Sequence, residues 1–247
     1  MASLESVRQK IGHCEFHLNL VKAEIDGYLK AHPGEFVTHA DSCVDKPLFA
    51  FRPVAPIPEK LSLLVGDCLQ NLRSSLDYLV WELVLVSKNQ PSTKNMFPIC
   101  LTPDSFKDAQ RGHRLDGLSA EVAALVDAFQ PYRDGQPGGT SLAILDELTN
   151  MNKHRRLLLT ELSSFSITEA LTTWESWLNA GMPGDSAIAH STDSGRAITP
   201  EQMAMQGDLV QFVTFNEGAI QGLEVGTLID TLVNYVKVLV DRFAIFF

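Results

Sequence analysis

The sequence has few cysteines, no excess of positive charge and no long apolar run, and each absence excludes a class of protein. Its four cysteines in 247 residues are widely spaced and form no Cys-x-x-Cys pair, which indicates reduced thiols in a cytoplasmic protein. The net charge of −10 disfavours broad binding to nucleic acid or to anionic membranes. No charge-free apolar stretch is long enough to cross a bilayer, and MASLESVRQKIGH has no signal-peptide core.

Recognised catalytic and metal-binding motifs are also missing. His13 and His17 have the spacing of a metal-binding pair, but the pattern lacks the glutamate of His-Glu-x-x-His and a third ligand. The segment DGQPGGTSL lacks the Gly-Lys-Ser/Thr of a P-loop and is predicted to be a loop followed by a helix cap. No serine or cysteine has the sequence context of a nucleophile elbow. We therefore expect no metal and no cofactor.

What the sequence does contain is an apolar content of 45%, enough for a real core, and one unusual stretch from Leu61 to Val86. Its apolar residues recur at alternating spacings of four and three, which predicts a helix packed in a bundle. The charged residues between Leu61 and Trp81 are Asp67, Arg73 and Asp77. A helix with so little charge is expected to be central and covered on most sides, with its charges paired.

Two further long helices are predicted at residues 3–31 and 222–246. The first repeats the three-four alternation, and the second is apolar on two stripes. Shorter strands and helices are expected between them, including a strand at 208–215. The predicted fold class is α+β, a helical bundle with a small β layer built from two insertions. We expect a single domain over 1–247, with the bundle at 1–32, 57–155 and 220–247 and the insertions at 33–56 and 156–219.

Polar residues gather in two places that could carry chemistry. One face of the central helix carries Asp67, Asn71, Ser74, Tyr78 and Trp81, and Arg73 and Asp77 are spaced to pair on a neighbouring face. The second cluster is NMNKHRR, at the end of a helix that begins near Thr140. The candidate ligand-binding residues are Asp67, Asn71, Asp77, Tyr78, Lys153 and Arg155, and the candidate catalytic residues are Arg73 and His154.

Two interpretations of these clusters stand side by side. In the first, they form a polar network that sets the register of the fold, with Asp77 meeting Arg73, Lys153 or Arg155. In the second, they form a site in which Arg73 and His154 act as a phosphate clamp and an acid/base.

Four segments are similar, in this order, to the motifs of a family of uncharacterised bacterial proteins: GDCLQNLRSSLDYLVWEL, MFPIC, FQPY and LDELTNMNKHRRLL. The family pattern is roughly G-D-x-L-x-N-L-R-S-x-L-D-H-L-V, then F-P-I, Q-P-Y and N-x-D-K-H-R. The resemblance covers residues 66–160, less than half of the chain. It implies a fold and carries no activity with it.

The first motif also resembles the HEPN ribonuclease superfamily, whose helical bundles cut RNA with an arginine followed four to six residues later by a histidine. Here Arg73 is followed by Tyr78 at that position. Because a tyrosine hydroxyl has an ordinary pKa near 10, it is a poor general acid or base at neutral pH. The substitution argues against nuclease activity.

The leading functional hypothesis is a non-enzymatic bacterial protein that acts through binding or assembly. The alternatives are a degenerate HEPN-like RNA-processing protein and a small-molecule binder with a pocket lined by Asn71, Tyr78 and Trp81. The expected partners are an unidentified small molecule or protein and a second copy of the chain. One apolar stripe of the helix at 222–246 can face the bundle, and the other is expected to be covered either by the β layer or by a second copy in a homodimer.

Overall fold

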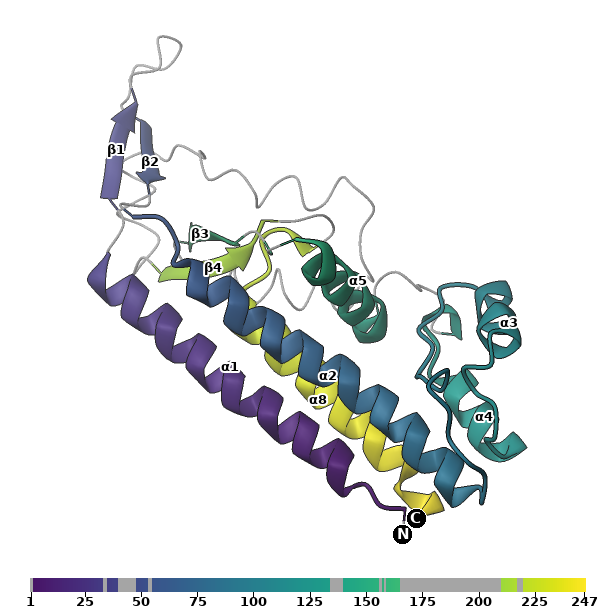
Figure 1. The fold of residues 1–247 in the computed structure, drawn as a ribbon. Coiled ribbons are helices and arrows are strands. Elements are labelled where there is room, and N and C mark those ends of the chain that lie inside the picture. The colour runs from purple at the N-terminus through teal and green to yellow at the C-terminus, as the bar shows by residue number, and fades with distance from the viewer. Residues whose placement is uncertain are drawn as a thin grey trace. The chain divides into compact units, whose positions relative to one another are not determined.

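The computed structural model describes residues 2–32, 35–39, 48–52, 55–133, 140–155, 157, 159–164, 210–216 and 220–247. The described chain is mostly helical (Figure 1). The loop predicted at DGQPGG and most of the second predicted insertion lie outside the described residues. No helix in the described ranges combines the length and apolarity that a bilayer-spanning segment needs.

Three long helices form the bundle, as the apolar spacing predicted: α1 (Glu5–Ala31), α2 (Glu59–Val86) and α8 (Val225–Phe243). A short 3-10 turn, η5 (Ala244–Phe246), follows α8. Shorter elements lie between α2 and α8: α3 (Pro103–Arg111), α4 (Ala120–Ala128), η1 (Pro131–Arg133) and α5 (Ser141–His154). The side chains of Ser119 and Thr140 cap α4 and α5 by accepting backbone N–H bonds, and the Thr140 cap confirms the helix start predicted near that residue.

The N-terminal part of α1 runs antiparallel to α2. Ser3, before the first turn of α1, donates its backbone N–H to Glu82 near the end of α2, at 3.0 Å. Further along α1, the backbone carbonyl of Cys14 accepts a bond from the Cys68 thiol at 3.7 Å. Both cysteines are buried and free. The contact with the Cys68 thiol, followed by burial, raises the pKa of the Cys14 thiol, so it stays protonated.

Helix α8 also runs antiparallel to α1, and the three helices lie alongside one another (Figure 1). Arg8 pairs with Asp241 at 3.7 Å, and Glu15, two turns later on α1, pairs with Lys237 on α8. These pairs join exposed or half-exposed side chains, so they orient the helices and contribute little to stability.

The core of the bundle is built from the predicted apolar seams. Every seam residue predicted on α1, from Leu4 to Tyr28, is buried, and those of α2 from Val65 to Leu83 have no exposed surface. Each fully buried leucine contributes about 1.5–3 kcal/mol from removal of apolar surface from water. On α8, both apolar stripes are buried in the chain itself; the buried residues are Leu228, Ile229, Leu232, Val233, Val236, Leu239, Val240 and Phe243. An uncovered stripe of α8 was the reason to expect a dimer, and that reason does not hold.

The strands form two separate antiparallel pairs. Strand β1 (Glu35–His39) pairs with β2 (Leu48–Arg52), and β3 (Leu159–Ser164) pairs with β4 (Val210–Phe215). Within the described residues these are two two-stranded sheets, and no contact joins them into one sheet. The predicted common β layer therefore stays a prediction.

The chain divides into two compact units. The first comprises Met1–Leu20, Leu63–Arg156 and Gly226–Phe247, and the second comprises Val21–Ser62 and Leu157–Val225. All candidate functional residues belong to the first unit. Whether the whole chain folds as one domain, as predicted, stays a prediction.

Candidate functional site

Helix α2 is covered on all but one narrow stripe, as its scarcity of charge predicted. Between Leu61 and Val86, the exposed residues are Leu63, Asp67, Gln70, Tyr78 and Trp81. The spacing of this stripe follows the helical repeat, so these side chains point the same way. The remaining positions are buried or half-buried, and they include Arg73, which is 9% exposed. The candidate residues of α2 therefore separate into an inner group and an outer group.

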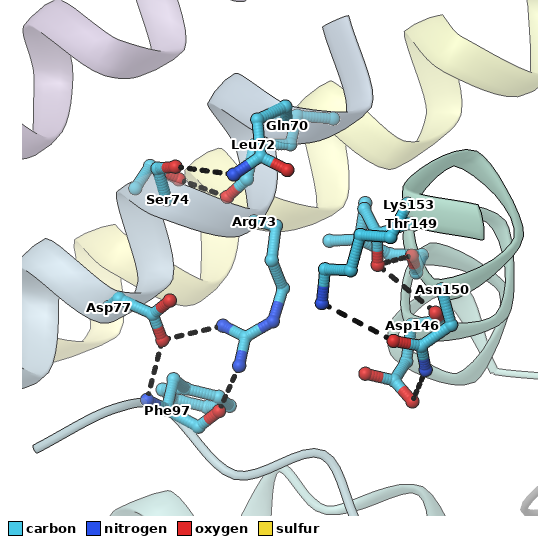
Figure 2. Close-up of polar contacts among 12 residues, drawn as sticks. Gln70, Leu72, Arg73, Ser74, Asp77, Phe97, Asp146, Thr149, Asn150 and Lys153 are labelled. Carbon is cyan, nitrogen blue, oxygen red and sulfur yellow. Dashed lines mark hydrogen bonds and ion pairs between the residues drawn. The ribbon is translucent and has the colours of Figure 1, made fainter. Parts of the chain in front are cut away.

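The inner group is centred on Arg73, Asp77 and the backbone of Phe97, called here the Phe97 network (Figure 2). Arg73 Nη1 donates to Asp77 Oδ1 at 2.7 Å, and Nη2 donates to the Phe97 carbonyl at 2.8 Å. The Phe97 backbone N–H donates to the same Asp77 Oδ1 at 2.9 Å. Both backbone groups of Phe97 are thus bonded by one ion pair, with the two charged groups one helical turn apart on α2.

The Phe97 network supplies hydrogen-bond partners to a segment that has no regular structure. Residues 96–100 lie in neither a helix nor a strand, and the Phe97 ring is fully buried. Buried backbone groups must find partners, because leaving one unpaired costs about 1–3 kcal/mol. Gln130 does the same for Cys100: its Oε1 accepts the Cys100 N–H at 2.9 Å, and the Gln130 side chain is fully buried. The motifs MFPIC and FQPY are therefore joined through backbone-binding side chains.

The Asp77 carboxylate is only half-buried, whereas its partner Arg73 is almost fully buried. Its side chain is 36% exposed, while that of Arg73 is 11% exposed. Both donors bind Oδ1, and Figure 2 shows the second carboxylate oxygen turned away from them. Desolvation raises the pKa of the Asp77 carboxyl, and the charges of Arg73 and Lys153 with the Phe97 N–H oppose that rise.

The end of α5 approaches α2 beside the Phe97 network. Lys153 donates to Asn150 Oδ1 at 3.3 Å, and Asn150 donates to Asp146 Oδ2 at 3.0 Å. Figure 2 shows these side chains on the side of α5 that faces Arg73. A methyl group at Gly66 of α2 would lie 2.6 Å from Asn152 Oδ1, so the absence of a side chain there allows α5 to pack closely.

His154 and Arg155 do not join Arg73. Both are exposed, in the last turn and at the C-cap of α5. The structure contains no hydrogen bond or ion pair between the described side chains of Arg73 and His154. The combination proposed from the sequence, a phosphate clamp with an acid/base, is not assembled by a direct contact. The interpretation as a structural network describes Arg73 and Asp77 better, and Lys153 acts on Asp77 through its charge.

The outer group lies between α1 and α2. Lys10 donates to Asn71 Oδ1 at 3.4 Å, and its ammonium group lies 5.6 Å from the centre of the Tyr78 ring. His17 Nδ1, which is buried and has no hydrogen-bond partner, lies 4.0 Å from Asp67 Oδ2. This surface is called here the α1–α2 face, and it is defined by Lys10, His13, His17, Asp67, Tyr78 and Trp81.

The contribution of α1 to this face was not predicted. In the sequence, His13 and His17 were recognisable only as an incomplete metal-binding pair, and no pattern singled out Lys10. No sequence signal shows that a side chain on one helix meets another helix 61 positions later, as Lys10 meets Asn71. Among the described residues, no group of three or more His, Cys, Asp or Glu side chains is arranged to hold a metal ion.

No protein-family model matches the chain, and no curated protein or solved structure matches it either. The resemblance of the four motifs to a bacterial family, and of the first motif to HEPN proteins, therefore stays a prediction.

Proposed function

We propose that the protein acts by binding another macromolecule through the α1–α2 face, and not by catalysis. The observation that carries the proposal is a difference in burial and bonding between Arg73 and the two aromatic residues Tyr78 and Trp81. Arg73 donates to partners inside the chain, whereas Tyr78 and Trp81 are each 43% exposed. Tyrosine and tryptophan provide large contact areas at low entropic cost, and they are enriched among residues that dominate binding energy.

The geometry gives less support to an RNA-cleaving enzyme. A HEPN-like mechanism needs an arginine and an acid/base acting on one substrate. Arg73 is buried, and a tyrosine occupies the position of the expected histidine. His154 is exposed on another helix, without a bond to Arg73. The net charge of −10 also opposes the capture of a phosphate backbone.

We further infer that the protein works in a reducing compartment, the cytoplasm. The three described cysteines, Cys14, Cys68 and Cys100, are all free and buried. Burial raises the pKa of the Cys100 thiol, which favours the protonated, unreactive form.

The binding proposal is tested by cross-linking the full-length protein in the cells that produce it. We expect adducts with the wild type and their loss in the variant Tyr78→Ser/Trp81→Ser. The matched control is Val238→Ser on α8, which removes an apolar side chain that is 58% exposed but lies outside the α1–α2 face. Equal adducts in all three proteins would contradict the proposal, as would a complete absence of adducts.

The absence of catalysis is tested with structured and single-stranded RNA at low salt. We expect no cleavage that depends on Arg73, Tyr78 or His154. Because Arg73→Ala is expected to destabilise the fold, Tyr78→Phe and His154→Ala serve as milder variants. RNA cleavage by the wild type that these two substitutions abolish would overturn the proposal and favour the HEPN-like alternative.

A further inference from the structure

We propose that Asp116 is a site of spontaneous covalent modification, at which the aspartate rearranges through a cyclic imide with Gly117 to isoaspartate, and that His113 supplies the proton for this step. The proposal is carried by the turn at 112–117, which connects α3 to α4 (Figure 1). The turn brings together an exposed aspartate, a glycine whose amide is free to react, and a histidine in contact with the aspartate carboxylate.

The backbone of the turn places His113 against Asp116. His113 has a φ of 67°, in the left-handed region that few residues other than glycine adopt, although histidine and asparagine enter it more often than most. His113 Nδ1 lies 2.7 Å from Asp116 Oδ2. Because an ionised carboxylate can only accept hydrogen bonds, Nδ1 carries the proton of this contact. The side chains are 54% and 60% exposed, so water reaches both of them.

The amide of Gly117 is available for reaction with that carboxylate. Within the part of the chain that the structure describes, its N–H donates to no acceptor, whereas its carbonyl accepts a bond from Asn89 at 2.8 Å. The fold also requires glycine here, since φ is +84° and a Cβ would lie 2.9 Å from Val84 Cγ1. Packing therefore fixes a residue without a side chain beside Asp116, and no side chain shields the attacking nitrogen.

The reaction is balanced without any further reagent. A bond forms between Gly117 N and Asp116 Cγ, and the bond from Cγ to Oδ2 breaks. The oxygen leaves as water with one proton from the amide N–H and one from the protonated His113 imidazole. Water then opens the five-membered imide, either at Cγ, which restores aspartate, or at the main-chain carbonyl of Asp116, which makes isoaspartate. The carboxylic acid that forms returns a proton to His113.

Isoaspartate at this position would disturb the contacts that hold the turn. Asn95, which is buried, donates to the Asp116 carbonyl at 2.9 Å, and Met96 N donates to the Arg114 carbonyl at 3.2 Å. The rearrangement turns the Asp116 carbonyl into a free carboxylate and adds a methylene to the main chain. The segment that leads into Phe97 would lose part of its attachment.

The chain contains a matched control for the turn. The dipeptide Asp-Gly occurs three times, at 26–27, 116–117 and 134–135, and the third lies outside the described residues. Asp26 is exposed, and a Cβ at Gly27 would meet nothing within 4 Å, so crowding does not hinder this site. Gly27 lies inside α1, where its amide is bonded to the carbonyl four residues earlier. Because ring closure must break that bond and distort the helix, we expect it to be at least about tenfold slower at Asp26 than at Asp116.

The experiment follows isoaspartate in the purified full-length protein over several weeks at neutral pH and physiological temperature. Trypsin separates the three sites into the peptides 23–30, 115–133 and 134–153. Isoaspartate is identified by mass-spectrometric fragmentation and by resistance to a protease that cuts before aspartate. We expect it to accumulate at Asp116 and not at Asp26, and the two sites to become similar when the protein is unfolded in urea. Equal amounts at both sites in the folded protein would overturn the proposal, as would a preference for Asp116 that persists in urea.

The role of His113 is tested with His113→Asn. Asparagine tolerates the left-handed backbone and can donate a hydrogen bond, but it cannot give up a proton. We expect isoaspartate to form at least about threefold more slowly at Asp116 in this variant. Circular dichroism and urea unfolding check that the variant is folded, and His113→Gly, which suits the positive φ, is the second variant. Asp116→Glu is the blank, because its longer side chain would have to close a less favoured six-membered ring. An unchanged rate in both folded His113 variants would show that His113 does not supply the proton.

Discussion

The Phe97 network makes a prediction in which two substitutions at one position differ sharply. Asp77→Ala removes the oxygen that accepts bonds from Arg73 and from the Phe97 N–H. Each hydrogen bond to a charged group contributes about 1.5–3 kcal/mol. Removing the Asp77 carboxylate also leaves the Arg73 guanidinium without its charged partner, at a site where Arg73 is 9% exposed. Water can reach the space left by the half-exposed carboxylate and offset part of the loss. We therefore expect Asp77→Ala to lower the free energy of unfolding by about 2–4 kcal/mol.

Asp77→Asn is expected to lose much less, about 1 kcal/mol or under. Both donors bind Oδ1, and an amide oxygen has two lone pairs, so asparagine can accept both bonds. Its NH₂ group would replace the carboxylate oxygen that is turned away from both donors. The negative charge of Asp77 contributes less to stability than the two hydrogen bonds do, because desolvation raises the pKa of Asp77 despite the nearby arginine.

The measurement is urea unfolding followed by far-ultraviolet circular dichroism, with the slope against urea checked for each variant. A double-mutant cycle of Asp77→Ala with Arg73→Ala should give a coupling above about 1 kcal/mol. The control cycle uses Asp108 and Arg111, an exposed pair at 3.0 Å on α3, for which we expect a coupling of about 0.3–0.5 kcal/mol. A loss below about 1 kcal/mol for Asp77→Ala, or equal losses for the alanine and asparagine variants, would refute the reasoning.

Two further predictions concern pH and the glycines of the long helices. The pKa of Asp77 is raised in the folded state, so the folded protein binds the proton more tightly than the unfolded chain does. The free energy of unfolding of the wild type, relative to that of Asp77→Asn, should therefore fall as pH rises through the pKa of Asp77. A rise would contradict the raised pKa. Gly12→Ala and Gly27→Ala should each raise the free energy of unfolding by about 0.5–1 kcal/mol, because a methyl group there meets nothing within 4 Å and alanine favours helix. Gly66→Ala should not raise the free energy of unfolding, because its methyl group would meet the Asn152 side chain, and the gain should return when Asn152→Ala is added. An equal gain at Gly66 with Asn152 in place would show that α5 does not pack against Gly66 as described.

The elements of the bundle could be predicted because local pattern determines them. The three-four spacing of apolar residues places one continuous face inward, and the positions of α1, α2 and α8 followed from it within a few residues. The scarcity of charge on α2 similarly predicted that only a narrow stripe would be exposed. The pairing of Arg73 with Asp77 was available in the same way, since residues four apart on a helix are neighbours.

The tertiary structure alone decided which partners these residues meet from elsewhere in the chain. The α8 sequence has two apolar stripes, but only the folded chain shows that both are buried. That Arg73 binds the Phe97 carbonyl, and that Lys10 reaches Asn71 and Tyr78, depends on contacts between segments far apart in sequence. The physical reason is that periodicity records which side of a helix avoids water, whereas the choice of partner depends on how the helices pack.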